Sequence, residues 1–187
     1  EEVEAALGTI DILVNNAGIP DAQRAHKMSN DFVDQVFSTN LVGPWKLSCE
    51  VARRLIAAEK PGRMINISSV GGFRYDGNGA ALYSVTKSAI VRMTECLAVE
   101  WSRYNINVNA VCPGMMDTDL MKGILVERSP FYGLTPEELH AQNKSNIPLT
   151  RMLTTEDVAH VVVFLASNKT DMMTGQAVNI TAGIEVH

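Results

Sequence analysis

RMINISS, at residues 63–69, is a short run of apolar residues that ends in two serines. Its length and its two isoleucines predict a buried β-strand. Three further apolar runs have the same character and lie at residues 10–14, 106–111 and 176–180. Segments with the apolar spacing of helices separate the runs, at residues 29–58, 82–104 and 155–167. This alternation predicts an α/β fold with a doubly wound parallel sheet and right-handed crossovers.

The composition is that of one globular domain over residues 1–187, with 46% apolar and 20% charged residues. A net charge of −5 argues against a nucleic-acid-binding surface. No run approaches the roughly 18 apolar residues of a membrane helix, and the acidic first residues do not resemble a signal peptide. Cys49, Cys96 and Cys112 are expected to be reduced core thiols, and the histidines lack the spacing of metal ligands. These features predict a cytoplasmic protein without a bound metal.

Polar or glycine-containing clusters follow three of the expected strands, at residues 15–18, 68–69 and 113–118. Ligands bind at the carboxyl ends of the strands in such sheets. Ordinary strand-to-helix caps explain each cluster alone, but they explain all three together poorly. The sequence therefore predicts a ligand site at this edge of the sheet.

Tyr83 and Lys87 are four residues apart near the start of an expected helix, so their side chains share one face. A free tyrosine has a pKa of about 10, and a nearby ammonium group should lower that value toward neutral pH. The pair is expected to act in acid–base chemistry. The alternative is an ordinary surface pair, because this spacing is common on amphipathic helices.

Two further polar residues accompany the tyrosine and the lysine. Ser69 ends a strand fourteen positions before Tyr83, and its hydroxyl could orient a substrate alcohol or carbonyl. Ser68 is the competing candidate for this role. Asn40 lies inside an expected helix, where asparagine is a mediocre helix former. It is either an exposed polar residue or an amide that bends the helix around a bound water and links Lys87 to solvent.

Five motifs in order resemble the short-chain dehydrogenase/reductase family, over essentially the whole chain. They are Asn15-Asn16-Ala17-Gly18, Asn40-Leu41-Val42-Gly43, Ile67-Ser68-Ser69, Tyr83-Ser84-Val85-Thr86-Lys87 and Val111-Cys112-Pro113-Gly114 with Thr118. The resemblance implies a Rossmann-like fold and a reaction that interconverts a secondary alcohol and a ketone with NAD or NADP.

The resemblance also implies roles for individual residues. It assigns catalysis to Asn40, Ser69, Tyr83 and Lys87, with Tyr83 passing a proton to or from the substrate oxygen. Lys87 would also bind the nicotinamide ribose, and Thr118 would hold the carboxamide. The cofactor would further contact Asn15, Ala17, Gly18, Pro113 and Gly114, together with Tyr83 itself.

The chain departs from the family pattern at its first residues. Family members begin with a strand and a glycine-rich turn that receives the pyrophosphate. Here the sequence opens with an expected helix just before the family's fourth strand, so it covers the C-terminal two-thirds of the fold. We therefore expect a fragment of a longer polypeptide, with an unpaired apolar edge at residues 10–14. The alternative is a non-catalytic remnant that cannot bind cofactor.

Residues 115–150 differ from the rest and are expected to be an irregular insertion with one or two short helices. The insertion lies where the family places its substrate lid, and Phe131-Tyr132 would either cover the pocket or pack against a neighbouring subunit. The lid and residues 148–152 loosely resemble polyol and diol dehydrogenases. The two long expected helices carry more apolar residues than covering one sheet face requires, and Trp45 and Trp101 are the extra ones. The resemblance implies that these helices pack against their counterparts in a homodimer or homotetramer.

Overall fold

The sheet contains four parallel strands that lie in the order of the chain. A computed structural model describes residues 2–75, 77 and 79–186. Within this part the sheet has the order β1-β2-β3-β4, and all three neighbouring pairs are parallel. The strands span Ile12–Asn15, Gly62–Ile67, Ile106–Pro113 and Ala177–Ile180. The predicted α/β fold with a parallel sheet is confirmed.

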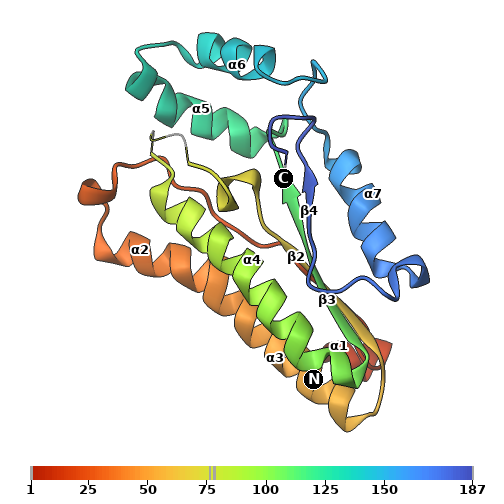
Figure 1. Ribbon diagram of the computed structural model, residues 1–187. Coiled ribbons are helices and arrows are strands. Elements are labelled where there is room, and N and C mark those ends of the chain that lie inside the picture. Colours follow the sequence, from red (N-terminus) through yellow and green to blue (C-terminus); the bar gives the residue numbers. More distant parts are fainter. Residues whose placement is uncertain (1, 76, 78, 187) are drawn as a thin grey trace.

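Helices cover both faces of the sheet and one of its ends (Figure 1). The helices α1 to α7 span Glu2–Leu7, Asn30–Phe37, Gly43–Ala57, Ala81–Trp101, Asp119–Tyr132, Pro136–Ser145 and Thr155–Ala166. The helices α3 and α4 lie on one face and α7 lies on the other, while α5 and α6 lie beyond the carboxyl ends of β3 and β4. No helix within the described residues combines the length and the apolar character needed to cross a membrane.

Alternation along β2 builds the core on both faces of the sheet. Met64 packs with Leu55 of α3 and Ile90 of α4, and all three side chains are at most 2% exposed. The next residue, Ile65, is fully buried against Leu165 of α7 on the opposite face. Successive strand residues point to opposite faces, so a strand covered on both sides is apolar throughout. This explains why Met64, Ile65 and Ile67 lie close together in β2, with only Asn66 between them.

Two helix residues lie differently from the sequence prediction. Trp101 is only 6% exposed, because it shares a face with Leu97 and Ala98 of α4 and joins the core. It is therefore not a surplus surface residue, whereas Trp45 of α3 is 48% exposed. Cys96 was predicted to be a core thiol but is exposed, because it precedes Leu97 and points away from the core.

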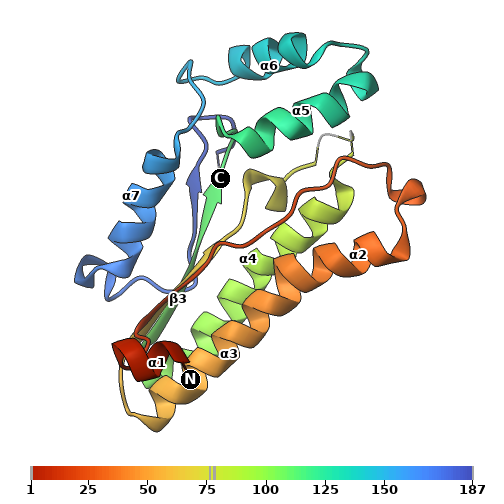
Figure 2. The same ribbon diagram turned by 180° about the vertical axis from the view of Figure 1, so that it is seen from behind.

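The edge strand β1 exposes apolar side chains, as predicted. Ile12 and Val14 remain 43% and 41% exposed, and β2 is the only strand that pairs with β1 within the described residues. Figure 2 shows α1 beside the end of α3, and an ion pair between Glu4 and Arg54 joins these helices.

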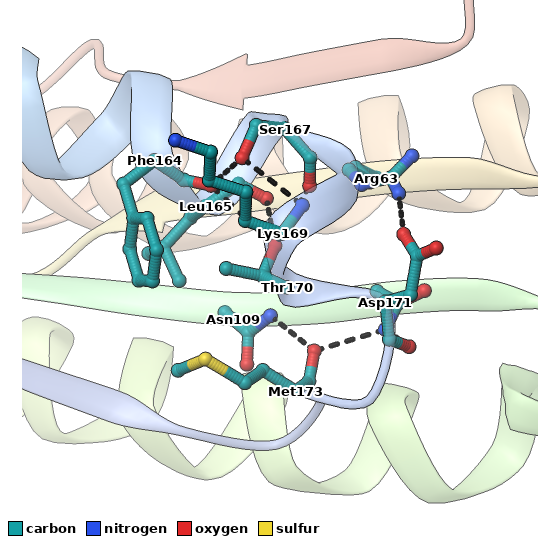
Figure 3. Close-up of polar contacts among 10 residues, drawn as sticks. Arg63, Asn109, Phe164, Leu165, Ser167, Lys169, Thr170, Asp171 and Met173 are labelled. Atoms are coloured by element: carbon teal, nitrogen blue, oxygen red, sulfur yellow. Dashed lines mark hydrogen bonds and ion pairs between the residues drawn. The ribbon is translucent and has the colours of Figure 1, made fainter.

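The segment between α7 and β4 is tied to the strands by polar side chains (Figure 3). Asn109 of β3 donates from Nδ2 to the carbonyl oxygen of Met173 at 2.8 Å, and Arg63 of β2 pairs with Asp171. Thr170 donates from Oγ1 to the carbonyl oxygen of Leu165 at 3.0 Å, which closes the end of α7. These contacts return the chain to the sheet in register for β4.

Candidate active site

A cavity of about 310 Å³ lies at the carboxyl ends of the strands and is lined on one side by α5. Its walls come from the loops that follow β1, β2 and β3, from the first turns of α4 and from α5. The polar clusters predicted to form a ligand site all contribute to it, through residues such as Gly18, Ser69 and Thr118. Separate loops meet here because parallel strands end at the same edge of a sheet.

Tyr83 and Lys87 project from the same side of α4 into this cavity. Nζ of Lys87 lies 5.5 Å from the centroid of the Tyr83 ring. It also donates to the carbonyl oxygen of Ile67 at 2.7 Å, and the lysine is only 4% exposed. The two residues are therefore not an ordinary surface pair.

The prediction that the pKa of the Tyr83 hydroxyl is lowered is wrong in direction. Burial raises the pKa of the Tyr83 hydroxyl above its usual value, although a hydrogen bond with Ser69 and the positive charge of Arg128 act to lower it. Lys87 is not among the groups that shift this pKa, and burial lowers the pKa of Lys87 itself to about 8. Helical spacing predicted the proximity of the two groups but not the cost of removing them from water.

The geometry favours Ser69 over Ser68 as the partner of the tyrosine. Ser69 hydrogen-bonds the Tyr83 side chain, which lowers the pKa of the tyrosine, and its Oγ also accepts from the backbone N–H of Gly71 at 3.1 Å. The hydroxyl of Ser68 donates instead to the carbonyl oxygen of Lys87 at 2.8 Å, and this serine is 2% exposed. Ser68 therefore holds β2 against α4.

Asn40 lies in a π-helical turn, Ser38–Val42, that joins α2 to α3 within the helix predicted over residues 29–58. It is 1% exposed, so it is not a surface polar residue. Its amide both donates to and accepts from the backbone of Ile19, at 2.9 Å and 2.8 Å, and donates to Oγ1 of Thr86 at 3.2 Å. The wider turn thus holds the loop after β1 against the start of α4.

Gly18 leaves space beside the lysine and the asparagine. A Cβ atom at this position would lie 3.4 Å from Nζ of Lys87 and 3.6 Å from Oδ1 of Asn40. A side chain extending beyond that atom would fill the floor of the cavity. The residues present fit the nicotinamide end of NAD or NADP here, because a buried lysine ammonium can donate to a ribose hydroxyl and the glycine leaves room for its close approach.

The remaining predicted cofactor residues divide into two groups. Pro113, Gly114 and Thr118 line the cavity, and Oγ1 of Thr118 also caps α5 by accepting from the backbone N–H of Met121. Asn15 and Ala17 do not line it. The Asn15 amide donates instead to Ser48 and Asn66 inside the protein.

Asn15 is therefore placed as a structural residue of the sheet edge, and its neighbour Asn16 lines the cavity in its place. This difference arises because side chains alternate along β1, so the buried position falls on Asn15.

Three site residues escaped the sequence analysis: Asp21, Arg74 and Arg128. Arg128 of α5 lines the cavity and donates from Nη2 to the carbonyl oxygen of Asp21 at 3.1 Å. Oδ2 of Asp21 in turn accepts from the backbone N–H of Tyr83 at 3.0 Å, and burial raises the pKa of its carboxyl. No local pattern distinguishes these residues from solvated charges, because they come from the loops after β1 and β2 and from α5, and only the tertiary fold brings these segments together.

The sequence matches known proteins along nearly its whole length. A family model described as enoyl-(acyl carrier protein) reductase matches residues 1–185. Galactitol 2-dehydrogenase of Agrobacterium fabrum is 33% identical over 181 residues, which make up 97% of this chain and 70% of that protein.

Solved structures resemble the fold equally well. Sorbitol-6-phosphate 2-dehydrogenase from Erwinia amylovora superimposes with a TM-score of 0.93 and is 29% identical, and the match covers 100% of this chain and 73% of that one. An actinorhodin polyketide ketoreductase variant crystallised with NADPH also has a TM-score of 0.93, at 30% identity, over 100% of this chain and 71% of its own.

Proposed function

Because the chain belongs to the short-chain dehydrogenase/reductase family, a family of oxidoreductases, we propose that it carries the catalytic site of an NAD(P)-dependent enzyme that interconverts a secondary alcohol and a ketone. The observation that supports this most directly is the meeting of Tyr83, Ser69 and Lys87 in one cavity at the carboxyl ends of the strands. These three groups can bind a substrate oxygen and exchange its proton.

Tyr83 acts as the acid or base in this proposal. Its hydroxyl gives a proton to the oxygen of a ketone during reduction and takes one from an alcohol during oxidation. The nicotinamide supplies or accepts the hydride when the cofactor is bound. Ser69 donates a hydrogen bond to the same substrate oxygen, so that the reacting carbon is held in a fixed orientation.

Lys87 and Asn40 maintain the proton supply and the cofactor position. The lysine ammonium has three donors, of which one is used by the carbonyl of Ile67, so two remain for the nicotinamide ribose and for water. Asn40 positions the loop that carries Gly18 beside this ammonium.

The cofactor proposed is NAD or NADP, in line with the NADPH of the ketoreductase neighbour. Contacts with the cofactor are proposed for Thr118, through the carboxamide, and for Pro113, Gly114, Gly18 and Ala17. Asn15 would contribute through its backbone, because its side chain is engaged inside the protein.

Residues 115–150 are proposed to form the substrate lid, through α5 and α6. Phe131 packs within the same chain, because the Arg24 guanidinium lies 4.8 Å from its ring centroid, and Tyr132 lines the cavity. These contacts favour a pocket cover over a subunit contact. Polyols and diols are candidate substrates, as the names of the two sugar-alcohol dehydrogenases suggest.

Cofactor binding by the full-length protein tests the proposal. The fluorescence of reduced nicotinamide should rise when NADH or NADPH binds, and oxidation of secondary alcohols should produce reduced nicotinamide. Absence of both signals would instead favour the non-catalytic alternative.

A pair of serine variants tests the assignment of Ser69. Ser69→Ala should lower kcat about ten- to hundredfold, because a hydrogen bond to a charge-bearing substrate oxygen is lost. Ser68→Ala should mainly lower the free energy of unfolding, by about 0.5–1.5 kcal/mol, since it removes the hydrogen bond that joins the end of β2 to the Lys87 carbonyl of α4. Steady-state kinetics and urea unfolding distinguish the two, and a larger kcat loss for Ser68→Ala would reverse the assignment.

We also propose that a second copy of the chain covers the exposed apolar residues of α3 in a homodimer or homotetramer. Trp45 and Leu47 are 48% and 55% exposed there. Sedimentation equilibrium measures the assembly, and a monomer at micromolar concentration would contradict it.

A further inference from the structure

The charged lining of the cavity has a single sign. Three cationic side chains contribute to it, from Arg74, Lys87 and Arg128, and no carboxylate side chain is found among the described residues of the lining. The chain as a whole carries a net charge of −5. A concave site with positive walls concentrates anions, most of all in a protein whose remaining surface repels them.

Arg128 has unused hydrogen-bonding capacity, as Lys87 does, but Lys87 is already proposed to bind the cofactor ribose. Its Nη2 bonds the carbonyl oxygen of Asp21, while its Nε is buried without a hydrogen-bond partner within the described residues. No carboxylate oxygen in that part of the chain lies within 4.0 Å of its guanidinium nitrogens. Arg74 differs, because its Nη1 donates to Ile184 and lies 3.5 Å from a carboxylate oxygen of Glu185.

A guanidinium that lines a cavity without a directly paired carboxylate has spare capacity to bind an anion. Buried charges are normally paired, since the protein interior replaces water poorly. The Arg128 side chain is held by the Asp21 carbonyl oxygen, and the Asp21 carboxylate interacts with it electrostatically without forming an ion pair within 4.0 Å among the described residues. An anion that enters the cavity would supply the missing partner.

The position of Arg128 relative to the reacting groups is set by one residue. Asp21 accepts from Arg128 with its carbonyl oxygen and from the backbone of Tyr83 with its carboxylate. Asp21 therefore bridges the guanidinium to the start of α4, which carries the acid–base hydroxyl of Tyr83. Its charge also reaches that hydroxyl, since Arg128 acts to lower the pKa of Tyr83.

We propose that Arg128 binds an anionic group of the substrate, so that the enzyme acts on hydroxy acids or phosphorylated polyols and the corresponding ketones in preference to neutral alcohols. Carboxylates and phosphates share the geometry that a guanidinium binds through two parallel hydrogen bonds. This inference rests on the proposed function, and it names the substrate class of the same cavity.

Matched substrate pairs test the preference. One arm compares 3-hydroxy acids with their methyl amides, and the other compares polyol phosphates with the free polyols, each at saturating cofactor with the full-length protein. The anionic member of at least one arm should have a kcat/KM about ten- to hundredfold higher. The arm that shows the larger ratio identifies carboxylate or phosphate as the group bound, and equal values in both arms would overturn the proposal.

Variants assign the preference to Arg128. Arg128→Gln should reduce the anionic-to-neutral ratio of kcat/KM to about 1, mainly through KM, and Arg128→Lys should keep part of it, because the charge remains. Arg92→Gln, which removes an exposed cation of α4 outside the cavity, is the matched control and should leave the ratio unchanged. An unchanged ratio in a folded Arg128→Gln variant contradicts the assignment.

Calorimetry with succinate and with inorganic phosphate separates this inference from the proposed function. If either anion binds and its binding is lost in Arg128→Gln, the anion site is supported. If in addition no alcohol in the panel is oxidised, the oxidoreductase proposal fails and the anion site still stands. Turnover of neutral alcohols, with neither anion bound by the unaltered protein, leaves the oxidoreductase standing and removes the anion site.

Discussion

Replacement of Tyr83 by phenylalanine is expected to lower kcat by about 10²- to 10⁴-fold, the usual contribution of a positioned acid or base. The phenyl ring keeps the packing of the residue and removes only the oxygen that exchanges a proton with the substrate. Because the lost hydroxyl bonds Ser69 at the wall of a cavity, the free energy of unfolding should change by no more than about 1 kcal/mol. Steady-state kinetics with the full-length protein measure the loss.

Tyr104→Phe is the matched control for this substitution. Tyr104 lies in the 3-10 turn after α4, is 44% exposed and does not line the cavity, so the same chemical change there should leave kcat unaltered. Fluorescence of bound reduced nicotinamide should be retained in both variants. If Tyr83→Phe kept more than about a tenth of the original kcat, the tyrosine would not be the acid–base group.

Replacement of Lys87 by methionine is expected to change the pH dependence of stability. The pKa of Lys87 falls from its ordinary value of 10.5 to about 8 in the folded protein. Between these two values the unfolded chain binds more protons than the folded one, so the free energy of unfolding of the unaltered protein rises with pH there. Methionine has a similar length and carries no charge, so it abolishes this dependence.

The size of the effect follows from the two pKa values. The buried ammonium lowers the free energy of unfolding more near pH 7 than near pH 9.5. The free energy of unfolding of Lys87→Met minus that of the unaltered protein should therefore be about 2 kcal/mol larger at pH 7. Urea unfolding at both pH values measures this difference. Lys169→Met, which removes an exposed lysine of the 3-10 turn after α7, is the control for loss of a lysine as such. An advantage of equal size at both pH values would show that Lys87 is not held in a desolvated state.

The same lysine shows how far local patterns reach. The four-residue spacing predicted correctly that Lys87 and Tyr83 share a face of one helix, because helix geometry follows from the backbone alone. The direction of the tyrosine pKa was not predictable from that spacing. It depends on how completely β2, α5 and the loop after β1 exclude water from the hydroxyl, and burial outweighs the neighbouring charges.

Asn40 in a helix and Asn15 in a strand show the same difference between what the local sequence predicts and what tertiary contacts decide. The poor helix propensity of Asn40 signalled an irregular helix, and the structure has a π-helical turn there. Its partners, Ile19 and Thr86, come from other segments and leave no trace in the local sequence. For Asn15, the motif pointed to the cofactor, but the strand phase turns the side chain into the sheet edge.

Apolar periodicity and the residues that interrupt it were sufficient to predict the order of strands and helices, the parallel sheet and the edge at which Ser69, Tyr83 and Lys87 gather. These properties arise from backbone geometry and from side-chain alternation, which are local. The positive character of the cavity arises differently. Arg128 reaches Tyr83 through Asp21 only after α5 folds over the cavity, so its place at the site depends on contacts between residues 107 and 62 positions apart.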